Sequence, residues 1–481
     1  MANQKPSVTG DSKLWAQEEF GKVLFKDKRL KARLIKIAQA FAAAPQANIP
    51  QACGDWAATK GSYRFFSHES ITGSQIMASH REATLERMRG ESLVFAVQDS
   101  TYLNFTTHSQ TSGLGPIGNN ADKTIGLMVH STLVLNASAL ALGVLDMSVS
   151  ARDPKQFAIK SKGRNRQKIQ DKESFKWVQG LAALQAAAGQ LPAHTRVVSI
   201  SDRESDLYEL FLAALQQEAN PRVDLLVRAR HERTLEPSGE GLWQSFAQGP
   251  CAASMVVQVP RQPGVSARAA TLSIRFAKVS LRAPVDRQKY QKLCEPLQLW
   301  AVEAKEQHPP QGMAPLCWRL LTSMALPNAE QAMEKVRWYT LRWQIEVFHK
   351  VLKSGCKVEQ RQLESASRLE RCLALDMVVA WRILALSKVG IETPGVSAAA
   401  LLAEAEWKAL YCYMHKTSSA PKEPPNLGQA LRWIGQLGGF LGRKGDGNPG
   451  PIVLWRGLQR LSDLTEAWLL FHPTQKTVGN A

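Results

Sequence analysis

Three acidic side chains stand at positions where they could share metal ions. Asp99 closes the apolar run SLVFAVQD, Asp202 closes RVVSISD, and Glu346 lies in a later helical segment. Carboxylates that converge repel one another strongly unless cations lie between them. Hard divalent ions, Mg²⁺ or Mn²⁺, are their natural partners, and two such ions per site can activate a water or a hydroxyl in phosphodiester chemistry. We therefore predict that these three residues are metal ligands and catalytic residues.

The third carboxylate belongs to one long helix, which the apolar periodicity predicts over residues 329–356. At about 100° per residue, spacings of three, four and seven put four polar side chains within roughly 60° of one another. They are Tyr339, Arg342, Glu346 and Lys353, with His349 at the edge of the face. Apolar residues on the opposite side predict that the helix packs on a core. A solvated surface with an Arg342–Glu346 ion pair at i and i+4 is the alternative interpretation.

Strands and helices alternate in the part of the chain that must position these residues. Three consecutive β-rich runs come first, then helix, strand, helix and strand, which fits a mixed α/β sheet with polar residues where strands end. The expected strands are 92–99, 125–135, 139–149, 196–202 and 223–230, and the expected helices are 174–188 and 204–217. Short β-type runs with Gly and Pro then predict a β-rich insertion at about 229–326, before the long helix.

Both ends of the chain are predicted to be helical. In the first 70 residues, basic side chains on small helices with interleaved aromatics suit a module that binds duplex DNA. A solvated basic face over a small aromatic core is equally open there. From about residue 386 onward, apolar stripes on helices suit core packing or an oligomer interface. The apolar run 373–386 contains Asp376 and Arg382, which predicts a core helix and no membrane span.

The composition points to a polyanionic partner. The 481 residues contain 60 Lys and Arg against 42 Asp and Glu, a formal net charge of +18. Such an excess favours nucleic acid first and a membrane surface second, and no amphipathic basic helix favours the second. Residues 152–172 alone hold eight basic and two acidic side chains, typical of a solvated loop or of one that contacts phosphates. Seven scattered cysteines and no apolar leader predict a cytosolic protein with reduced thiols.

The polar face of the long helix also resembles a known family. YTLRWQIEVFHKVLKSG, with the spacing Y-(2)-R-(3)-E-(6)-K, resembles the signature of bacterial cut-and-paste DDE transposases of the insertion-sequence-four family. VQDSTYLNF and SDRESDLYE resemble the motifs around the first and second aspartates of that family. The positions similar to its N-terminal DNA-binding module are Asp27, Arg29, Arg33 and the triplet Tyr63-Arg64-Phe65. The likeness covers nearly the whole chain.

This resemblance implies a ribonuclease-H-like mixed sheet as the catalytic domain, at residues 71–385, interrupted by the β-rich insertion. An N-terminal helical DNA-binding domain would occupy residues 1–70, and a C-terminal helical dimerisation domain residues 386–481. The implied activity is cut-and-paste transposition: nicking of transposon ends, hairpin formation and opening, and strand transfer into target DNA. The implied partners are Mg²⁺ or Mn²⁺, double-stranded inverted-repeat ends and target DNA, and a second copy of the chain in a synaptic complex. The implied location is the bacterial cytosol, at the nucleoid.

The resemblance also implies roles for single residues. Arg342 and Lys353 would hold phosphates near the scissile bond, and Tyr339 would contact the DNA backbone. Trp318 matches an insertion-domain tryptophan on which a flipped base stacks, while a core position in a β run is equally open. Further DNA or phosphate contacts are expected from Arg203, Arg228, Arg230, His349 and Lys350, and from Arg29, Arg33 and Arg64 near the N-terminus.

Two local and two functional alternatives stay open. Arg203 could pair with Asp206, and His349 could be an exposed helix residue. A non-transposing structure-specific nuclease would keep the metal site without joining ends. A DNA-binding regulator descended from a transposase would bind without cleaving. The intact set of three carboxylates argues against the regulator, because binding alone would tolerate the loss of one of them.

Overall fold

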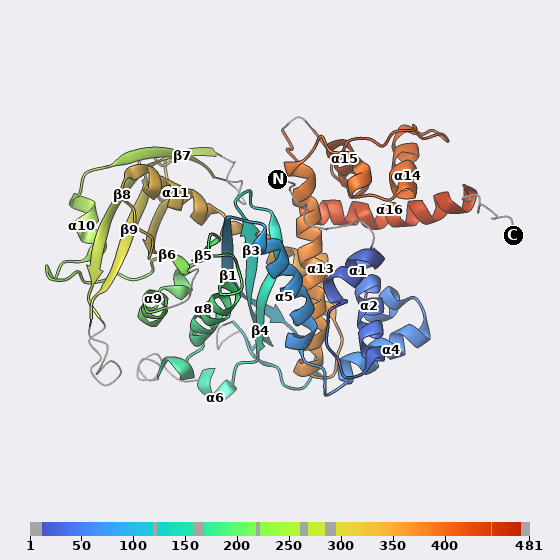
Figure 1. Ribbon diagram of the computed structural model, residues 1–481, viewed down its shortest axis with the longest axis horizontal. Coiled ribbons are helices and arrows are strands. Elements are labelled where there is room, and N and C mark those ends of the chain that lie inside the picture. The colour runs from blue at the N-terminus through green and yellow to red at the C-terminus, as the bar shows by residue number, and fades with distance from the viewer. Residues whose placement is uncertain are drawn as a thin grey trace.

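The computed structural model shows a mixed α/β protein in which one large sheet is flanked by helices (Figure 1). It describes residues 12–118, 123–157, 168–217, 222–259, 268–283, 295–443 and 445–472. The first eleven residues, where no leader was expected, and the middle of the basic loop lie outside this set. Within it, no helix is long and apolar enough to cross a membrane.

Within the described residues, the central sheet has ten strands. Its first part comprises β1 (Leu93–Asn104), β2 (Gly115–Pro116), β3 (Ile125–Asn136), β4 (Ala141–Ser150), β5 (Arg196–Ser201) and β6 (Val223–Arg228). β1 pairs antiparallel with β3 and parallel with β5, and β5 pairs parallel with β6. The order across the sheet is β2-β3-β1-β5-β6-β10-β9-β8-β7, with β4 paired to β3. The expected mixed α/β sheet is therefore confirmed.

The segment after β6 is β-rich, and it continues the same sheet. It contains α10 (Leu242–Gln248), β7 (Ala253–Val259), β8 (Arg268–Leu281), β9 (Leu297–Glu306) and β10 (Cys317–Thr322). β10 pairs antiparallel with β6, with Leu320 opposite Arg228, and β9, β8 and β7 follow as an antiparallel meander. This pairing brings Trp318, two residues earlier on β10, beside the end of β6.

Alternating side chains of β1 face two separate cores. The helices around the sheet are α5 (Gly73–Arg89), α8 (Phe175–Ala188), α9 (Tyr208–Leu215), α12 (Trp343–Lys350) and α13 (Ala366–Glu392). Phe95 and Val97 belong to the core shared with α12 and α13. Val94 and Ala96 belong to the core shared with α8 and α9, as expected for a strand buried on both faces. Asp99 has the parity of Val97, so its side chain lies on the α12 side.

The prediction of one continuous helix over 329–356 is wrong. The segment consists of α11 (Ala329–Thr340), α12 and a π-helical turn, η3 (Val351–Gly355), with a turn at Leu341 and Arg342 between the two α-helices. The backbone N–H groups of Leu341, Arg342 and Ile345 bond carbonyls three residues back, which tightens the winding there. No Pro or Gly stands in this turn, so no sequence signal marks it.

The N-terminal region is helical, as expected. It contains α1 (Ser12–Phe20), α2 (Lys28–Ala43), α3 (Ile49–Cys53) and α4 (Trp56–Ser67). Asp27, Asn48 and Asp55 accept N–H groups in the first turns of α2, α3 and α4, which satisfies donors that a helix start leaves free. Phe41 and Phe66 pack beneath them in a small aromatic core.

The C-terminal helices gather at one end of α13, and the N-terminal helices gather at its other end (Figure 1). They are α14 (Glu404–His415), α15 (Leu427–Leu437) and α16 (Pro451–Phe471). Short elements complete the chain: α6 (Pro154–Phe157), η1 (Ile169–Asp171), η2 (Arg203–Ser205), η4 (Val358–Gln360) and η5 (Ala398–Ala400). As expected, the run 373–386 is buried in α13.

A buried ion pair joins these regions. The Arg361 guanidinium, just after η4, donates to the Asp376 carboxylate on α13 at 2.7 Å. It also donates to the carbonyls of Pro45 and Ala47, in the turn between α2 and α3. One side chain therefore links the segment after η3 to the N-terminal helices and to α13.

Candidate active site

The two aspartates lie side by side because of strand register. Val97 on β1 is opposite Ile200 on β5, and Asp99 and Asp202 each follow by two residues. The prediction that Asp99 ends its strand is wrong, because β1 continues for five more residues by pairing with β3 alone. Asp202 does follow directly on β5, and its carboxylate caps η2 by accepting the N–H of Glu204 at 2.9 Å.

Arg342 binds two of the three carboxylates. Its Nη1 lies 3.4 Å from Oδ2 of Asp99, and its Nη2 forms a short ion pair with Oε1 of Glu346. Burial raises the pKa of Asp99 to about 6, and the charges of Asp202 and Glu346 act in the same direction while Arg342 opposes them. The structure therefore brings Asp99, Asp202 and Glu346 into one electrostatically coupled cluster.

The donor atoms of this carboxylate cluster suit a hard cation, but their present arrangement does not surround one. Carboxylate oxygens are the ligands that Mg²⁺ and Mn²⁺ prefer. In the part of the chain that the structure describes, no group of three or more His, Cys, Asp or Glu is placed to hold a metal ion. Arg342 instead supplies positive charge between Asp99 and Glu346. Metal binding would therefore require Arg342 to release at least one of them.

Tyr339 and Trp318 lie together, near the carboxylate cluster. Their rings meet edge to face with centroids 6.0 Å apart. Tyr339 is 4% exposed, and its buried hydroxyl has no hydrogen-bond partner among the described residues. Burial raises the pKa of Tyr339, whereas the nearby Arg342 and Arg228 guanidinium groups oppose this rise without giving the hydroxyl a well-formed hydrogen bond. The hydroxyl is enclosed by protein, so DNA cannot reach it in this arrangement, and the predicted contact of Tyr339 with the DNA backbone requires the side chain to be uncovered first.

The cationic residues after Glu346 occupy different environments. Lys353 lies partly buried in η3, and burial lowers its pKa, while Lys350 is exposed. His349 is 7% exposed, and its Nε2 lies 2.9 Å from the hydroxyl oxygen of Ser131 on β3. The alternative of an exposed His349 is therefore wrong, and the predicted DNA contact does not fit, because the ring faces the sheet.

Arg203 and Arg230 are exposed after β5 and β6. The alternative pairing of Arg203 with Asp206 is wrong. The buried Asp206 carboxylate pairs with Arg233, which sequence reasoning missed, and accepts the N–H groups of Arg230 at 2.7 Å and of His231 at 3.0 Å. Asp206 thus fixes the backbone after β6 and leaves Arg203 available to an external anion.

The N-terminal helices present cations and one aromatic ring at their surface. Arg29 pairs with Asp27 at the start of α2 and remains highly exposed, and Arg64 is exposed in the last turn of α4. Arg33 is partly buried and lies against α4 at Gly61. Trp56, which the sequence pattern did not single out, is 77% exposed. Exposed cations with an exposed indole suit contact with nucleic acid.

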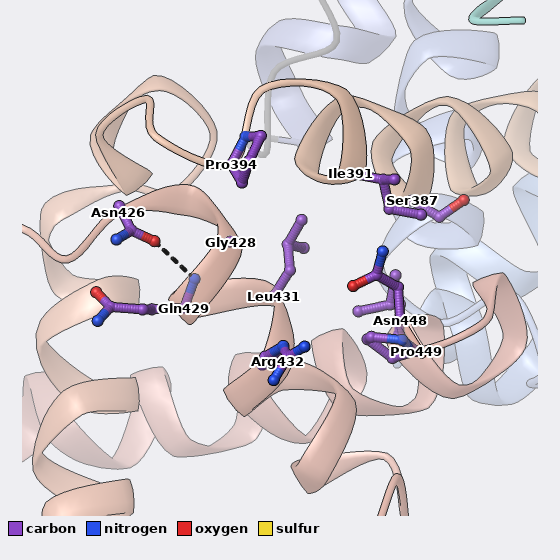
Figure 2. Close-up of a pocket in the computed structure, with 11 residues that line it drawn as sticks. Ser387, Ile391, Pro394, Asn426, Gly428, Gln429, Leu431, Arg432, Asn448 and Pro449 are labelled. Carbon is purple, nitrogen blue, oxygen red and sulfur yellow. Dashed lines mark hydrogen bonds between the residues drawn. The ribbon is translucent and has the colours of Figure 1, made fainter. Parts of the chain in front are cut away.

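Two further surface features were not predicted. Trp343 begins α12 directly after Arg342 and is 50% exposed. A pocket of about 410 Å³ lies between the end of α13, α15 and the turn before α16 (Figure 2). Arg432 is the one charged residue that lines this pocket. The pocket is therefore separate from the carboxylate cluster.

Two family models match this chain, one toward each end. The model described as transposase DNA-binding matches residues 12–71, which include α1 to α4. The model described as transposase Tn5 dimerisation domain matches residues 378–470, from within α13 into α16. These two matches support a Tn5-like DNA transposase with DNA as a partner and a dimeric assembly. The carboxylate cluster lies between the two matched regions, where neither model reaches.

Among solved structures, one similar chain is described as the cryo-EM structure of a piggyBac transposase synaptic complex with hairpin DNA. The similarity has a TM-score of 0.37 and 9% sequence identity, over 99% of this chain and 81% of that chain. A likeness of this strength carries no argument about the fold or the mechanism of the present chain.

Proposed function

We propose that this chain is a cut-and-paste DNA transposase of the DDE type. The observation that carries the proposal is the cluster in which Asp99 lies close to Asp202 and shares Arg342 with Glu346, between the regions matched to DNA-binding and dimerisation models. Its substrates are double-stranded inverted-repeat ends and then target DNA, and its working form is a homodimer in a synaptic complex. The net charge of +18 supports a polyanionic substrate.

Asp99, Asp202 and Glu346 would hold two Mg²⁺ ions, or Mn²⁺ in their place. Ions bound there activate a water or a 3′-hydroxyl and stabilise the leaving oxygen of the phosphodiester. The raised pKa of Asp99 supports this assignment, because it reflects a buried carboxylate with two acidic neighbours and too little positive charge nearby.

The other residues near the carboxylate cluster suit the DNA phosphates. Arg342 has a planar guanidinium that can exchange a carboxylate for a phosphate near the scissile bond. Tyr339 would bond the DNA backbone only after its hydroxyl, which is buried here without a partner, is uncovered. Lys353 would add a point charge. Trp318 and Trp343 are both partly exposed and would stack on a base that leaves the duplex when a hairpin forms.

The finer assignments belong to the same proposal. We infer a ribonuclease-H-like core, supported by the order β4-β3-β1-β5-β6, with antiparallel β3–β1 and parallel β1–β5–β6 pairing. The spacing of Tyr339, Arg342, Glu346 and Lys353 supports the insertion-sequence-four family. The proposed domains are residues 1–70 for DNA binding, 71–385 for catalysis and 386–481 for dimerisation. The proposed location is the bacterial cytosol at the nucleoid.

The test uses the full-length protein, Mg²⁺ and a labelled duplex that carries the inverted repeat flanking its own reading frame. On a denaturing gel we expect a nick followed by a hairpin-length product. Glu346→Gln should lower the rate of nicking by about 10³-fold or more, because residues that act as one catalytic unit fail together. Glu330→Gln removes an exposed carboxylate from the first turn of α11 and should leave the rate unchanged.

The same experiment separates the alternatives. Cleavage without a hairpin, and without joining to a target plasmid, identifies a structure-specific nuclease. Binding in a gel-shift assay without cleavage, in Mn²⁺ as well as Mg²⁺, identifies a regulator or a full-length protein that inhibits itself. Normal cleavage by Glu346→Gln contradicts the assignment of the active site.

A further inference from the structure

A buried hydrogen bond links the helix that carries Glu346 to the sheet. His349 Nε2 and the Ser131 hydroxyl oxygen lie 2.9 Å apart. Ser131 is 1% exposed, and His349 is buried as described above. Among the described residues, this is the one hydrogen bond between a side chain within α12 and a strand of the sheet. A directional contact of this kind is what would fix the rotation of a helix about its own axis.

The two ends of this hydrogen bond lie next to two of the carboxylates. Ser131 on β3 is the register partner of Asp99 on β1. Side chains directly opposite in an antiparallel pair project on the same face of the sheet, so Asp99 and Ser131 both face α12. His349 follows Glu346 by three residues, less than one turn along the same helix. The Ser131–His349 bond is therefore a short connection between the backbone that carries Asp99 and the helix that carries Glu346.

Arg342 also bridges Asp99 and Glu346, but metal binding must open at least one of these ion pairs, and the remaining contacts leave α12 open to rotation. α12 has only eight residues and is separated from α11 by the turn at Leu341 and Arg342. It runs into the π-helical turn η3 at its other end. Ile345 and Phe348 bury its apolar side, but apolar packing is non-directional. A small rotation of α12 would swing Glu346 along an arc relative to Asp99, and the Ser131–His349 bond opposes that rotation.

We propose that Ser131 and His349 are positioning residues that set the separation of the Glu346 and Asp99 carboxylates, and thereby the affinity of the site for divalent cations. This inference rests on the proposed function, because it takes the carboxylate cluster as the cation site. Neither side chain is a ligand in it: His349 uses Nε2 for Ser131, and both groups are enclosed by protein.

The test measures Mn²⁺ binding by the full-length protein without DNA, from the loss of the free-Mn²⁺ electron paramagnetic resonance signal. Ser131→Ala and His349→Phe should each weaken Mn²⁺ binding about tenfold, the lower range for residues that orient metal ligands. The double variant should bind no more weakly than either single variant, because both changes remove the same hydrogen bond. His349→Gln places an amide nitrogen near the position of Nε2 and should restore binding to within about twofold of wild type, a rescue that loss of packing alone would not produce.

Ser273→Ala is the matched control. Ser273 is also a buried serine in the sheet, but it lies on β8, far from the carboxylate cluster in the strand order. Its hydroxyl donates to the carbonyl of Lys305 on the adjacent strand β9. It should leave Mn²⁺ binding unchanged. Thermal unfolding followed by circular dichroism identifies any variant that fails to fold. If His349→Phe does not fold, the Mn²⁺ affinity of Ser131→Ala alone tests the positioning role.

The failure of this inference and the failure of the proposed function give different results. If wild type binds no Mn²⁺, or Asp99→Asn binds it as wild type does, the cation site and the proposed function are wrong. If Asp99→Asn loses Mn²⁺ but folded Ser131→Ala and His349→Phe retain wild-type affinity, only the positioning role is overturned. Additive losses in the double variant also overturn it, since they would show that the two side chains act separately.

Discussion

The strands that carry Asp99 and Asp202 and the helical stretch that carries Glu346 reach the same site by different means. On the strands, the parallel register that pairs Val97 with Ile200 sets where the chain carries the two aspartates, which each follow two residues later. In the helical stretch, α12 follows a turn and runs on into the π-helical turn η3, and the side chains of Arg342 and His349 make hydrogen-bonded contacts to the sheet.

Because of this difference, substitutions on the strands and substitutions in the helical stretch should have different effects. A side-chain substitution on β1 or β5 changes the chemistry of that side chain but leaves the main-chain pairing in place. A substitution in or after α12 also changes the position of the helix, because side chains supply the directional contacts there.

Asp202→Asn should lower the nicking rate about 10³-fold or more while leaving the gel-shift affinity for the inverted repeat unchanged, because it removes a charge from the proposed metal site but keeps the cap of η2. Glu204→Gln, two residues on and half-exposed, is the matched change and should lower the rate less than about fivefold by the same reasoning. Single-turnover gel assays measure both. Equal losses in the two variants would contradict a specific role for Asp202.

Arg361→Met should lower the free energy of unfolding by about 3–5 kcal/mol, since it leaves the buried Asp376 carboxylate without its counter-charge. The exposed pair of Arg368 with Glu364 lies seven residues on, and Arg368→Met should cost at most about 1 kcal/mol. Urea unfolding followed by tryptophan fluorescence measures both. Similar costs would mean that the segment after η3 is not held by its buried ion pair.

Stability should fall as the pH drops below about 6.5, because of the buried group around His80. Its Nε2 accepts the N–H of Val144 at 2.9 Å, so the folded state holds the neutral ring with its Nδ1–H directed at Glu19, and burial lowers the pKa of His80. Below this pH, His80 binds a proton in the unfolded chain but stays neutral in the folded chain. Acid therefore favours unfolding by up to about 1.4 kcal/mol per pH unit. Glu19 acts in the same sense at lower pH. Burial alone would raise its pKa, but Arg87 and His80 lower it, so its contribution is lost as acid protonates it.

Urea unfolding between pH 8 and pH 5 measures this slope. His80→Gln should reduce the slope without abolishing it, because burial also lowers the pKa values of His130 and His349, to about 3. His194→Gln removes an exposed histidine and should leave the slope unchanged. An unaltered slope in His80→Gln would count against the neutral, buried ring.

The smallest effect is expected at the start of α11. The Asn328 side chain accepts the N–H of Gln331 at 3.0 Å, and Asn328→Ala should lower the free energy of unfolding by about 1 kcal/mol. The nicking rate should change less than twofold, because α11 is separated from α12 by the turn at Leu341. A large loss of cleavage would show that α11 and α12 move as one helix.

The strand segments around the aspartates were predictable because β-branched, apolar runs end in a carboxylate. The continuation of β1 past Asp99 was not, because it depends on pairing with β3 along its whole length. The broken helix was unpredictable for a related reason: no Pro or Gly marks the turn before α12, and tertiary contacts set it. His349 follows the buried Ile345 by four residues and adjoins the buried Phe348, so its ring lies on the buried side of α12.

The partners of charged residues were also hard to predict where they depend on tertiary contacts. The sequence offered Arg203 as a partner for Asp206. In the structure Asp206 pairs with Arg233 instead, because the chain after β6 folds back over the buried carboxylate. By contrast, the ion pair of Arg342 with Glu346, which the i and i+4 spacing suggested as part of the alternative interpretation of this face, does form despite the turn before α12. Local spacing was thus more informative than long-range pairing.

The central claim is that Asp99, Asp202 and Glu346, from three separate segments, form one cation site. The most direct measurement replaces Mg²⁺ with Fe²⁺, starts local radical cleavage with ascorbate and peroxide, and maps the cuts in the full-length protein by mass spectrometry. The account predicts cuts near all three residues in one reaction, suppressed by excess Mg²⁺ and abolished in Asp99→Asn. Cuts confined to one segment, or unchanged in Asp99→Asn, would contradict it.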